Sequence, residues 1–137
     1  MEFTVTDKIA PQDRKAVVDG LTAYNAPFVG QAAVRPLGVF VRDAAGVPCA
    51  GLTGYTHGAW LFIQYLWVGA PLRGQGAGSG LLHAAEAEAR RRGCTRAFVD
   101  TFAFQSPGFY QKQGYHIAFT LEEHPATGTH SYLVKEL

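Results

Sequence analysis

A glycine-rich loop that leads into a long helical pattern is the part of this sequence best suited to bind phosphate. An apolar segment beginning at Leu66 meets a turn at Pro71, and the loop 73–79 follows before a helical run that ends at Gly93. Glycines let a backbone approach a ligand closely, and a helix N-terminus offers unpaired N–H groups and partial positive charge. We therefore expect a pyrophosphate site at the start of this helix.

Several kinds of glycine-rich loop must be distinguished here. A P-loop requires a lysine after its last glycine, and none stands there. A dinucleotide fingerprint requires an acidic residue about 20 residues further on; Asp100 lies near that distance, but no second mononucleotide-binding half follows. A loop that only connects a strand to a helix stays an alternative. The remaining pattern is Arg/Gln-x-x-Gly-x-Gly/Ala, formed by Arg73, Gly76 and Gly78.

A second motif stands further along the chain. Phe109 and Tyr110 form an aromatic pair, and three residues later come Gly114 and Tyr115. Together the two motifs resemble the signatures of the GNAT superfamily of acetyl-coenzyme A-dependent N-acetyltransferases. The resemblance extends over nearly the whole chain and is weakest over residues 27–36.

The resemblance implies transfer of an acetyl group from acetyl-coenzyme A to a primary amine of a small molecule or peptide, without a metal. Tyr110 corresponds to the tyrosine that protonates the leaving sulfur, although packing beside Phe109 is the alternative role. The cofactor-binding residues that the resemblance implies are Leu66, Trp67, Val68, Arg73, Gly74, Gln75, Gly76, Ala77, Gly78, Ser79 and Phe109.

A general base is harder to assign. The apolar strand over residues 60–68, expected at the centre of the sheet, has no Asp or Glu, and its Gln64 can only orient a water molecule. His57 at the preceding turn is a candidate base, because a free imidazole titrates near neutral pH. The alternative is a solvent-exposed turn residue without a catalytic role. No base is needed if the acceptor amine is already neutral. Further candidates, without a motif, are Asp100, Glu122 and His124.

Two other functions stay open at this point. A binding module that senses acyl-coenzyme A without turnover would keep the glycine-rich loop and need no base. A nucleotide-binding protein of another class would bind ATP or NAD more tightly than coenzyme A.

Hydrophobic periodicity predicts an α/β (α+β, three-layer) fold, a GNAT fold by resemblance, with a mixed, mostly antiparallel seven-stranded sheet flanked by helices. The strand–helix–strand crossover from 60–68 to 95–102 predicts a parallel central pair. We expect surface ion pairs Glu86–Arg90 and Glu88–Arg92 on the long helix. The expected strands are 2–6, 37–42, 48–57, 60–68, 95–102, 115–121 and 130–135. The expected helices are 11–26, ended by Pro27, then 77–92 and 107–113, with a loop or short helix over 28–35.

The whole chain fits one domain, residues 1–137. A net charge of +1 gives no reason to expect nucleic acid or an anionic membrane as partner. Cys49 and Cys94 are typical of free thiols in a reducing compartment. With no signal peptide or membrane-spanning run visible, we expect a soluble cytoplasmic protein, and the resemblance adds a possible homodimer.

Overall fold

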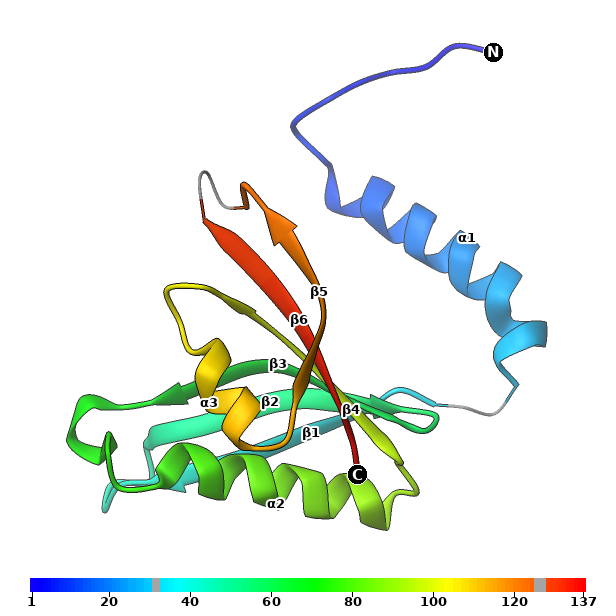
Figure 1. Ribbon diagram of the computed structural model, residues 1–137. Helices are drawn as coiled ribbons and strands as arrows, with labels where there is room; N and C mark the ends of the chain where they lie inside the picture. Colours follow the sequence, from blue (N-terminus) through cyan, green and yellow to red (C-terminus); the bar gives the residue numbers. More distant parts are fainter. Residues whose placement is uncertain (31–32, 125–127) are drawn as a thin grey trace. The chain divides into compact units, whose positions relative to one another are not determined.

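The computed structural model describes residues 1–30, 33–124 and 128–137 and divides the chain into two compact units, Met1–Ala32 and Ala33–Leu137 (Figure 1). In the first unit, residues 1–10 contain no strand, so the predicted strand 2–6 is wrong. Alternation of apolar and polar residues suits a strand only where a neighbouring strand supplies hydrogen bonds. No such pairing joins this segment to another described residue.

Helix α1 (Pro11–Val29) runs through Pro27, so the predicted stop before this proline is also wrong. A proline so close to the helix end costs one backbone hydrogen bond, and only Phe28 and Val29 follow it. Gly30, at φ +59°, then ends the helix. The predicted loop or short helix over 28–35 lies partly outside the described residues, at 31–32. None of the described helices is long and apolar enough to cross a bilayer.

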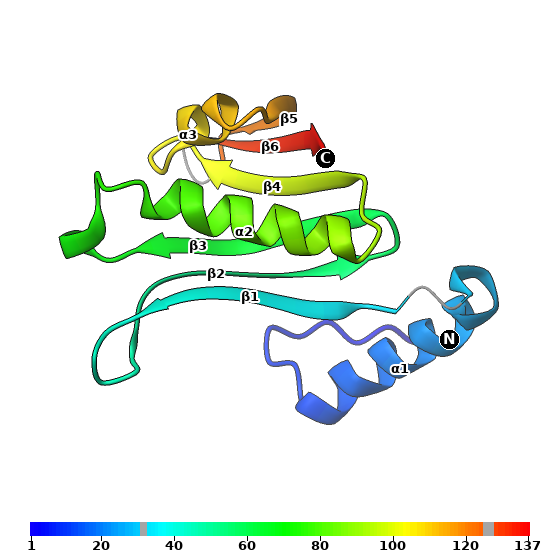
Figure 2. The same ribbon diagram turned by 90° about the horizontal axis from the view of Figure 1, so that it is seen from below.

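The second unit contains a six-stranded sheet in the order β1-β2-β3-β4-β6-β5 (Figure 2). Every neighbouring pair is antiparallel except β3 and β4, which are parallel as predicted. The sheet has six strands because residues 2–6 do not add a seventh. The strands are β1 (Arg35–Arg42), β2 (Pro48–His57), β3 (Trp60–Val68), β4 (Arg96–Phe102), β5 (His116–Glu122) and β6 (Thr129–Glu136).

Helix α2 (Ala77–Arg91) packs its apolar stripe on one face of this sheet. Leu81, Leu82, Ala85 and Ala89 are all buried, as their helical spacing predicts. The short helix η1 (Ala70–Leu72) follows β3, and α3 (Pro107–Lys112) follows β4. Strand residues that face α2 complete the core: Leu52, Leu61, Ile63, Val99 and Leu133.

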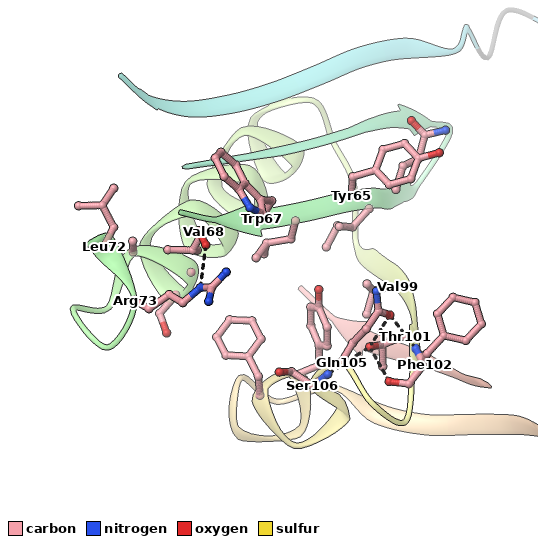
Figure 3. Close-up of a pocket in the computed structure, with 18 of the residues that line it drawn as sticks. Tyr65, Trp67, Val68, Leu72, Arg73, Val99, Thr101, Phe102, Gln105 and Ser106 are labelled. Atoms are coloured by element: carbon pink, nitrogen blue, oxygen red, sulfur yellow. Dashed lines mark hydrogen bonds between the residues drawn. The ribbon is translucent and has the colours of Figure 1, made fainter. Parts of the chain in front are cut away.

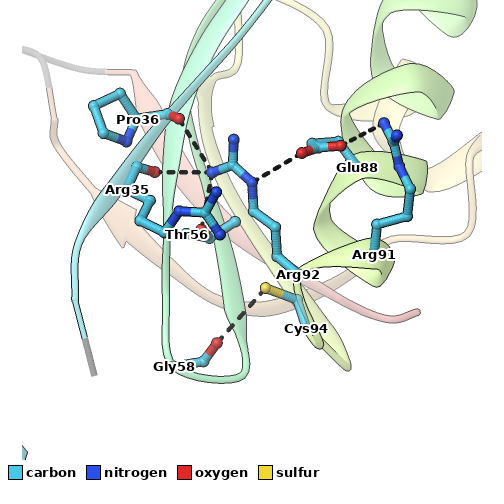
Figure 4. A network of polar contacts seen from close by, with 8 residues as sticks. All are labelled: Arg35, Pro36, Thr56, Gly58, Glu88, Arg91, Arg92 and Cys94. Atoms are coloured by element: carbon cyan, nitrogen blue, oxygen red, sulfur yellow. Dashed lines mark hydrogen bonds and ion pairs between the residues drawn. The ribbon is translucent and has the colours of Figure 1, made fainter. Parts of the chain in front are cut away.

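Arg92 links the C-terminal end of α2 to strands β1 and β2 (Figure 4). Its Nε donates to Glu88 at 3.1 Å, which confirms the predicted pair, and this bond holds the pKa of the Glu88 carboxyl below its ordinary value. The Arg92 Nη1 also donates to the carbonyl oxygens of Arg35 and Pro36 and to Thr56 Oγ1. The arginine therefore orders the sheet edge as well as the helix end.

Glu86 does not form the expected surface pair with Arg90, because its side chain is buried. Its carboxylate accepts the Tyr115 hydroxyl at 2.8 Å and the Lys135 ammonium at 3.0 Å. Burial, together with the charge of Glu86, raises the pKa of Tyr115. A single carboxylate thus links α2 to Tyr115, which directly precedes β5, and to Lys135 of β6.

Replacing Glu86 with alanine is expected to lower the free energy of unfolding by about 3 kcal/mol, because Lys135 and Tyr115 would lose their shared acceptor in the interior. Urea denaturation measures the change. Glu136→Ala is the control, since it removes an exposed carboxylate one residue after Lys135. Equal stability of the Glu86 and Glu136 variants would show that the buried cluster does not stabilise the fold.

Candidate functional site

Strands β3 and β4 pair only over their first four residues and then separate. The register joins Trp60–Ile63 to Arg96–Val99 and goes no further. A β-bulge at Gln64 marks the separation, because Ile63 and Tyr65 face consecutive residues of β2, Gly54 and Thr53. A side chain at Gly54 would place its Cβ 2.1 Å from a backbone oxygen of β3, so the close approach at this bulge requires glycine.

A cavity of about 920 Å³ lies where the two strands separate (Figure 3). All but one of the twelve predicted site residues line it. Gln75 is the exception, because its amide turns back and donates to the Pro71 carbonyl at 2.7 Å. The predicted residues in the cavity wall are Leu66, Trp67, Val68, Arg73, Gly74, Gly76, Ala77, Gly78, Ser79, Phe109 and Tyr110.

The loop before α2 has the geometry of an anion site. Gly74 and Gly76 adopt φ values of +74° and +80°, which strongly favour glycine. Gly76 is the N-cap residue and no side chain caps the helix, so the first-turn N–H groups point outward unpaired. Arg73 adds positive charge, and its Nε donates to the Val68 carbonyl at 3.2 Å (Figure 3). A pyrophosphate fits this combination of backbone donors, dipole and guanidinium.

Tyr110 enters the same cavity from α3. Its side chain is only 8% exposed, and burial, with a smaller contribution from the negative charge of Asp100, raises the pKa of Tyr110 to about 12. The phenol therefore stays protonated at neutral pH and can donate a proton. Phe109 packs edge-on against it, and its ring lies beside Gly78, 3.4 Å from where a Cβ would stand.

Comparison with known proteins identifies the family. Residues 9–115 match the model of the Acetyltransferase (GNAT) family, more than half of the chain. The chain belongs to the GNAT family. A blasticidin-S acetyltransferase of Streptomyces morookaense is 44% identical over 107 residues, which cover 75% of this chain and 79% of the relative.

Solved structures agree with this family. A crystal structure of an acetyltransferase from Agrobacterium tumefaciens matches all of both chains with a TM-score of 0.93 and 33% identity. A streptothricin acetyltransferase from Bacillus anthracis, solved with acetyl coenzyme A, shares the fold: the TM-score is 0.66 at 14% identity, over 75% of this chain and 63% of the other. This GNAT protein is thus an acetyltransferase that uses acetyl-coenzyme A as acetyl donor, and the glycine loop described above fits the cofactor's pyrophosphate.

Some of the candidate bases of this GNAT enzyme line the cavity and others do not. Gln64 and Asp100 line the cavity. Among the described residues, His57, Glu122 and His124 do not line it; His57 pairs with Trp60, at the opposite end of β3. In residues 1–30, 33–124 and 128–137, no group of acidic, histidine or cysteine side chains could hold a metal ion.

Sequence reasoning missed several residues of the GNAT cavity. They lie around the point where β3 and β4 part and in the segments that follow these strands. Their position at the carboxyl end of a strand predicted to be parallel was the available signal, since ligands gather there in parallel sheets. Gln105 stabilises the C-terminal end of β4, because its side-chain oxygen accepts a hydrogen bond from the Phe102 N–H at 2.8 Å (Figure 3). The missed lining residues are Ile63, Tyr65, Leu72, Val99, Thr101, Phe102 and Ser106.

Proposed function

We propose that this enzyme transfers the acetyl group directly to a primary amine, with Tyr110 as general acid. The main support is a tyrosine that stays protonated in the cavity containing the glycine-rich loop. The amine nitrogen attacks the thioester carbon, the C–S bond breaks, and the Tyr110 hydroxyl gives its proton to the departing thiolate. Attack leaves the nitrogen positively charged, and the phenolate takes a proton from this nitrogen, which gives the neutral amide and restores the phenol.

The cofactor role of the loop belongs to the same proposal. First-turn N–H groups of α2, Gly74, Gly76 and the Arg73 guanidinium would bind the pyrophosphate. Residues 66–68 pair with β2 on one side, but their edge toward β4 has no partner strand because β3 and β4 separate. The backbone groups on that edge would hold the pantetheine arm and polarise the thioester oxygen.

We propose a small-molecule amine as acceptor. The relative named blasticidin-S acetyltransferase supports this class, because it is 44% identical over 75% of this chain. Peptide amines are the competing class. A screen that follows free-thiol release compares blasticidin S, other small amines and short peptides; we expect turnover with small amines and little with peptides. Thiol release above background with peptides alone would overturn this choice of acceptor.

The acyl-coenzyme A sensor remains the alternative function. It predicts that cofactor binds tightly while no amine in the screen releases thiol. The position of Tyr110 favours an enzyme over a sensor, because binding alone does not require a proton donor beside the acetyl site.

We also propose a single functional domain that works in the cytoplasm. The family match spans residues 9–115, across both compact units, which supports one domain. Cys49 and Cys94 are free thiols, as a reducing compartment favours.

We further propose that the enzyme is a homodimer. Helix α1 has an apolar stripe at helical spacing, formed by Val17, Leu21, Tyr24 and Phe28. In the second unit, Phe40, Tyr65 and Phe119 are exposed on the sheet face opposite α2. Apolar surfaces of this extent mark association sites. A second copy of the chain can cover such surfaces in a closed two-fold pair.

Leu21→Lys tests the homodimer by placing a charge in the apolar stripe. Light scattering coupled to size-exclusion chromatography should give a dimer mass for the wild-type protein and a monomer mass for this variant. Gln12→Lys adds the same charge away from the stripe and should leave the dimer intact. A wild-type monomer at all accessible concentrations would rule out the homodimer.

A further inference from the structure

Asp100 reaches the cavity from the side of the sheet opposite the glycine loop. Side chains alternate along a strand: its neighbours Val99 and Thr101 are buried toward α2, so Asp100 lies on the other face. The separation of β3 and β4 lets residues from both faces line one cavity. A carboxylate therefore stands across the cavity from the anion site.

His130 of strand β6 holds this carboxylate. Its Nε2 lies 2.6 Å from Asp100 Oδ2, and the histidine side chain is 8% exposed whereas that of Asp100 is 38% exposed. The buried His130 Nδ1 has no hydrogen-bond partner among the described residues. Among the described residues, the His130 ring has one hydrogen-bond partner, Asp100 Oδ2, and the second carboxylate oxygen is left available to a ligand.

Aromatic rings surround His130 on several sides. The His130 ring packs 4.3 Å from Phe102, 4.7 Å from Tyr132 and 5.3 Å from His124, measured between ring centroids. Aromatic faces attract organic cations, and the same environment strengthens a carboxylate–ammonium contact. Of these rings Phe102 lines the cavity together with Asp100, so a carboxylate and an aromatic ring both favour a positively charged amine there.

We propose that Asp100 binds the acceptor as an ammonium ion and takes the proton that it must lose before attack, with His130 as the positioning residue. This inference rests on the proposed acetyl transfer. In the step, one N–H bond of the ammonium breaks, the proton passes to a carboxylate oxygen of Asp100, and the freed lone pair attacks the thioester carbon. The exposed edge of Asp100 returns the proton to solvent after product leaves.

Kinetics of Asp100→Asn test the proton transfer with the best amine of the acceptor screen. At pH 7, kcat/KM for the amine should fall about 10²- to 10⁴-fold, while the dissociation constant of acetyl-coenzyme A stays unchanged. The deficit should shrink as pH rises, because more amine arrives neutral. The titratable groups around the pair are His130, which is bonded to Asp100, Tyr132, its cross-strand neighbour, Tyr110, on which the Asp100 charge acts, and His124, which stacks on His130. A deficit that is constant with pH, or no deficit, would overturn the proposal.

Two variants of His130 separate positioning from packing. His130→Gln keeps a hydrogen-bond donor, whereas His130→Phe keeps a flat ring without one. The glutamine variant should retain more kcat/KM than the phenylalanine variant if donation to Asp100 matters. The reverse order would show that the ring only packs. Glu136→Gln, an exposed carboxylate on the same strand, is the control and should match wild type.

Ligand binding tests the ammonium site even if no amine is turned over. Phenethylammonium and 2-phenylethanol are titrated into the coenzyme A-loaded protein while NMR follows the His130 ring signals. Only the ammonium should shift them, and the shift should disappear in Asp100→Asn. No ammonium-selective shift would overturn the site even if acetyl transfer occurs. An ammonium-selective shift without turnover would instead leave the site standing and refute the proposed function.

Discussion

Tyr110→Phe is expected to lower kcat by about 10²- to 10⁴-fold, the contribution typical of a general acid. A tyrosine phenol is protonated at neutral pH, and burial, with a smaller contribution from the Asp100 charge, raises the pKa of Tyr110 further, to about 12. Without it, the thiolate must leave unprotonated or take a proton from water. The dissociation constant of acetyl-coenzyme A, measured by calorimetry, should change little.

Tyr115→Phe is the matched control for that experiment. Tyr115 packs edge-on against Tyr110, but its hydroxyl donates to Glu86 in the interior. Its removal should lower the free energy of unfolding and leave kcat near wild type. Equal kcat values for wild-type and Tyr110→Phe enzymes would remove Tyr110 from the mechanism.

Gly76→Val is expected to weaken acetyl-coenzyme A binding by about 10²-fold or more. A Cβ at Gly76 meets no protein atom within 4 Å, so the side chain would occupy open space at the N-terminus of α2. The pyrophosphate would lose at least two charge-assisted hydrogen bonds of about 1.5 kcal/mol each. Calorimetric titration of acetyl-coenzyme A measures the effect.

Gly93→Val controls for backbone strain in that experiment. Gly93 has φ +89°, close to the +80° of Gly76, and it also meets no atom within 4 Å, but it lies beyond the C-terminal end of α2. Both variants should lose about 1–3 kcal/mol of stability from the left-handed conformation. Only the Gly76 variant should lose cofactor affinity. Equal affinity in both variants would mean that the loop does not bind the cofactor.

Most of the second unit follows from local patterns in the sequence. The helix 77–92 has an apolar stripe, and the crossover that contains it allows only a parallel pairing of the strands on either side. Both features depend on residues close together in sequence. The glycine loop could be assigned for the same reason, since its spacing and the helix that follows are contiguous.

Two of the errors arise where distant residues decide the outcome. Residues 2–6 alternate like a strand, yet strand formation depends on a neighbour that a local pattern cannot supply. Glu86 stands four residues before Arg90, a surface spacing, but Tyr115 and Lys135 provide a buried environment for its charge.

The pairing of Asp100 with His130 shows the same limit within the site. Thirty residues separate them, and they meet because β6 lies beside β4, with Asp100 opposite Tyr132 in the register. From the sequence alone, Asp100 is one of several candidate bases that no motif supports. Its partner and its place in the cavity depend on the sheet order, which local sequence does not encode.

A single-turnover reaction with acetyl-coenzyme A labelled with ¹³C in the acetyl group tests direct transfer most directly. Enzyme in excess is mixed with the labelled cofactor and blasticidin S or the best amine of the screen, and mass spectrometry follows both the acceptor and the intact protein. We predict that the label appears in the acceptor as an amide at the rate of thiol release, while the protein mass stays constant. A labelled protein that forms and decays before the amide appears, or cofactor that stays intact with every amine, would contradict direct acetyl transfer by this enzyme.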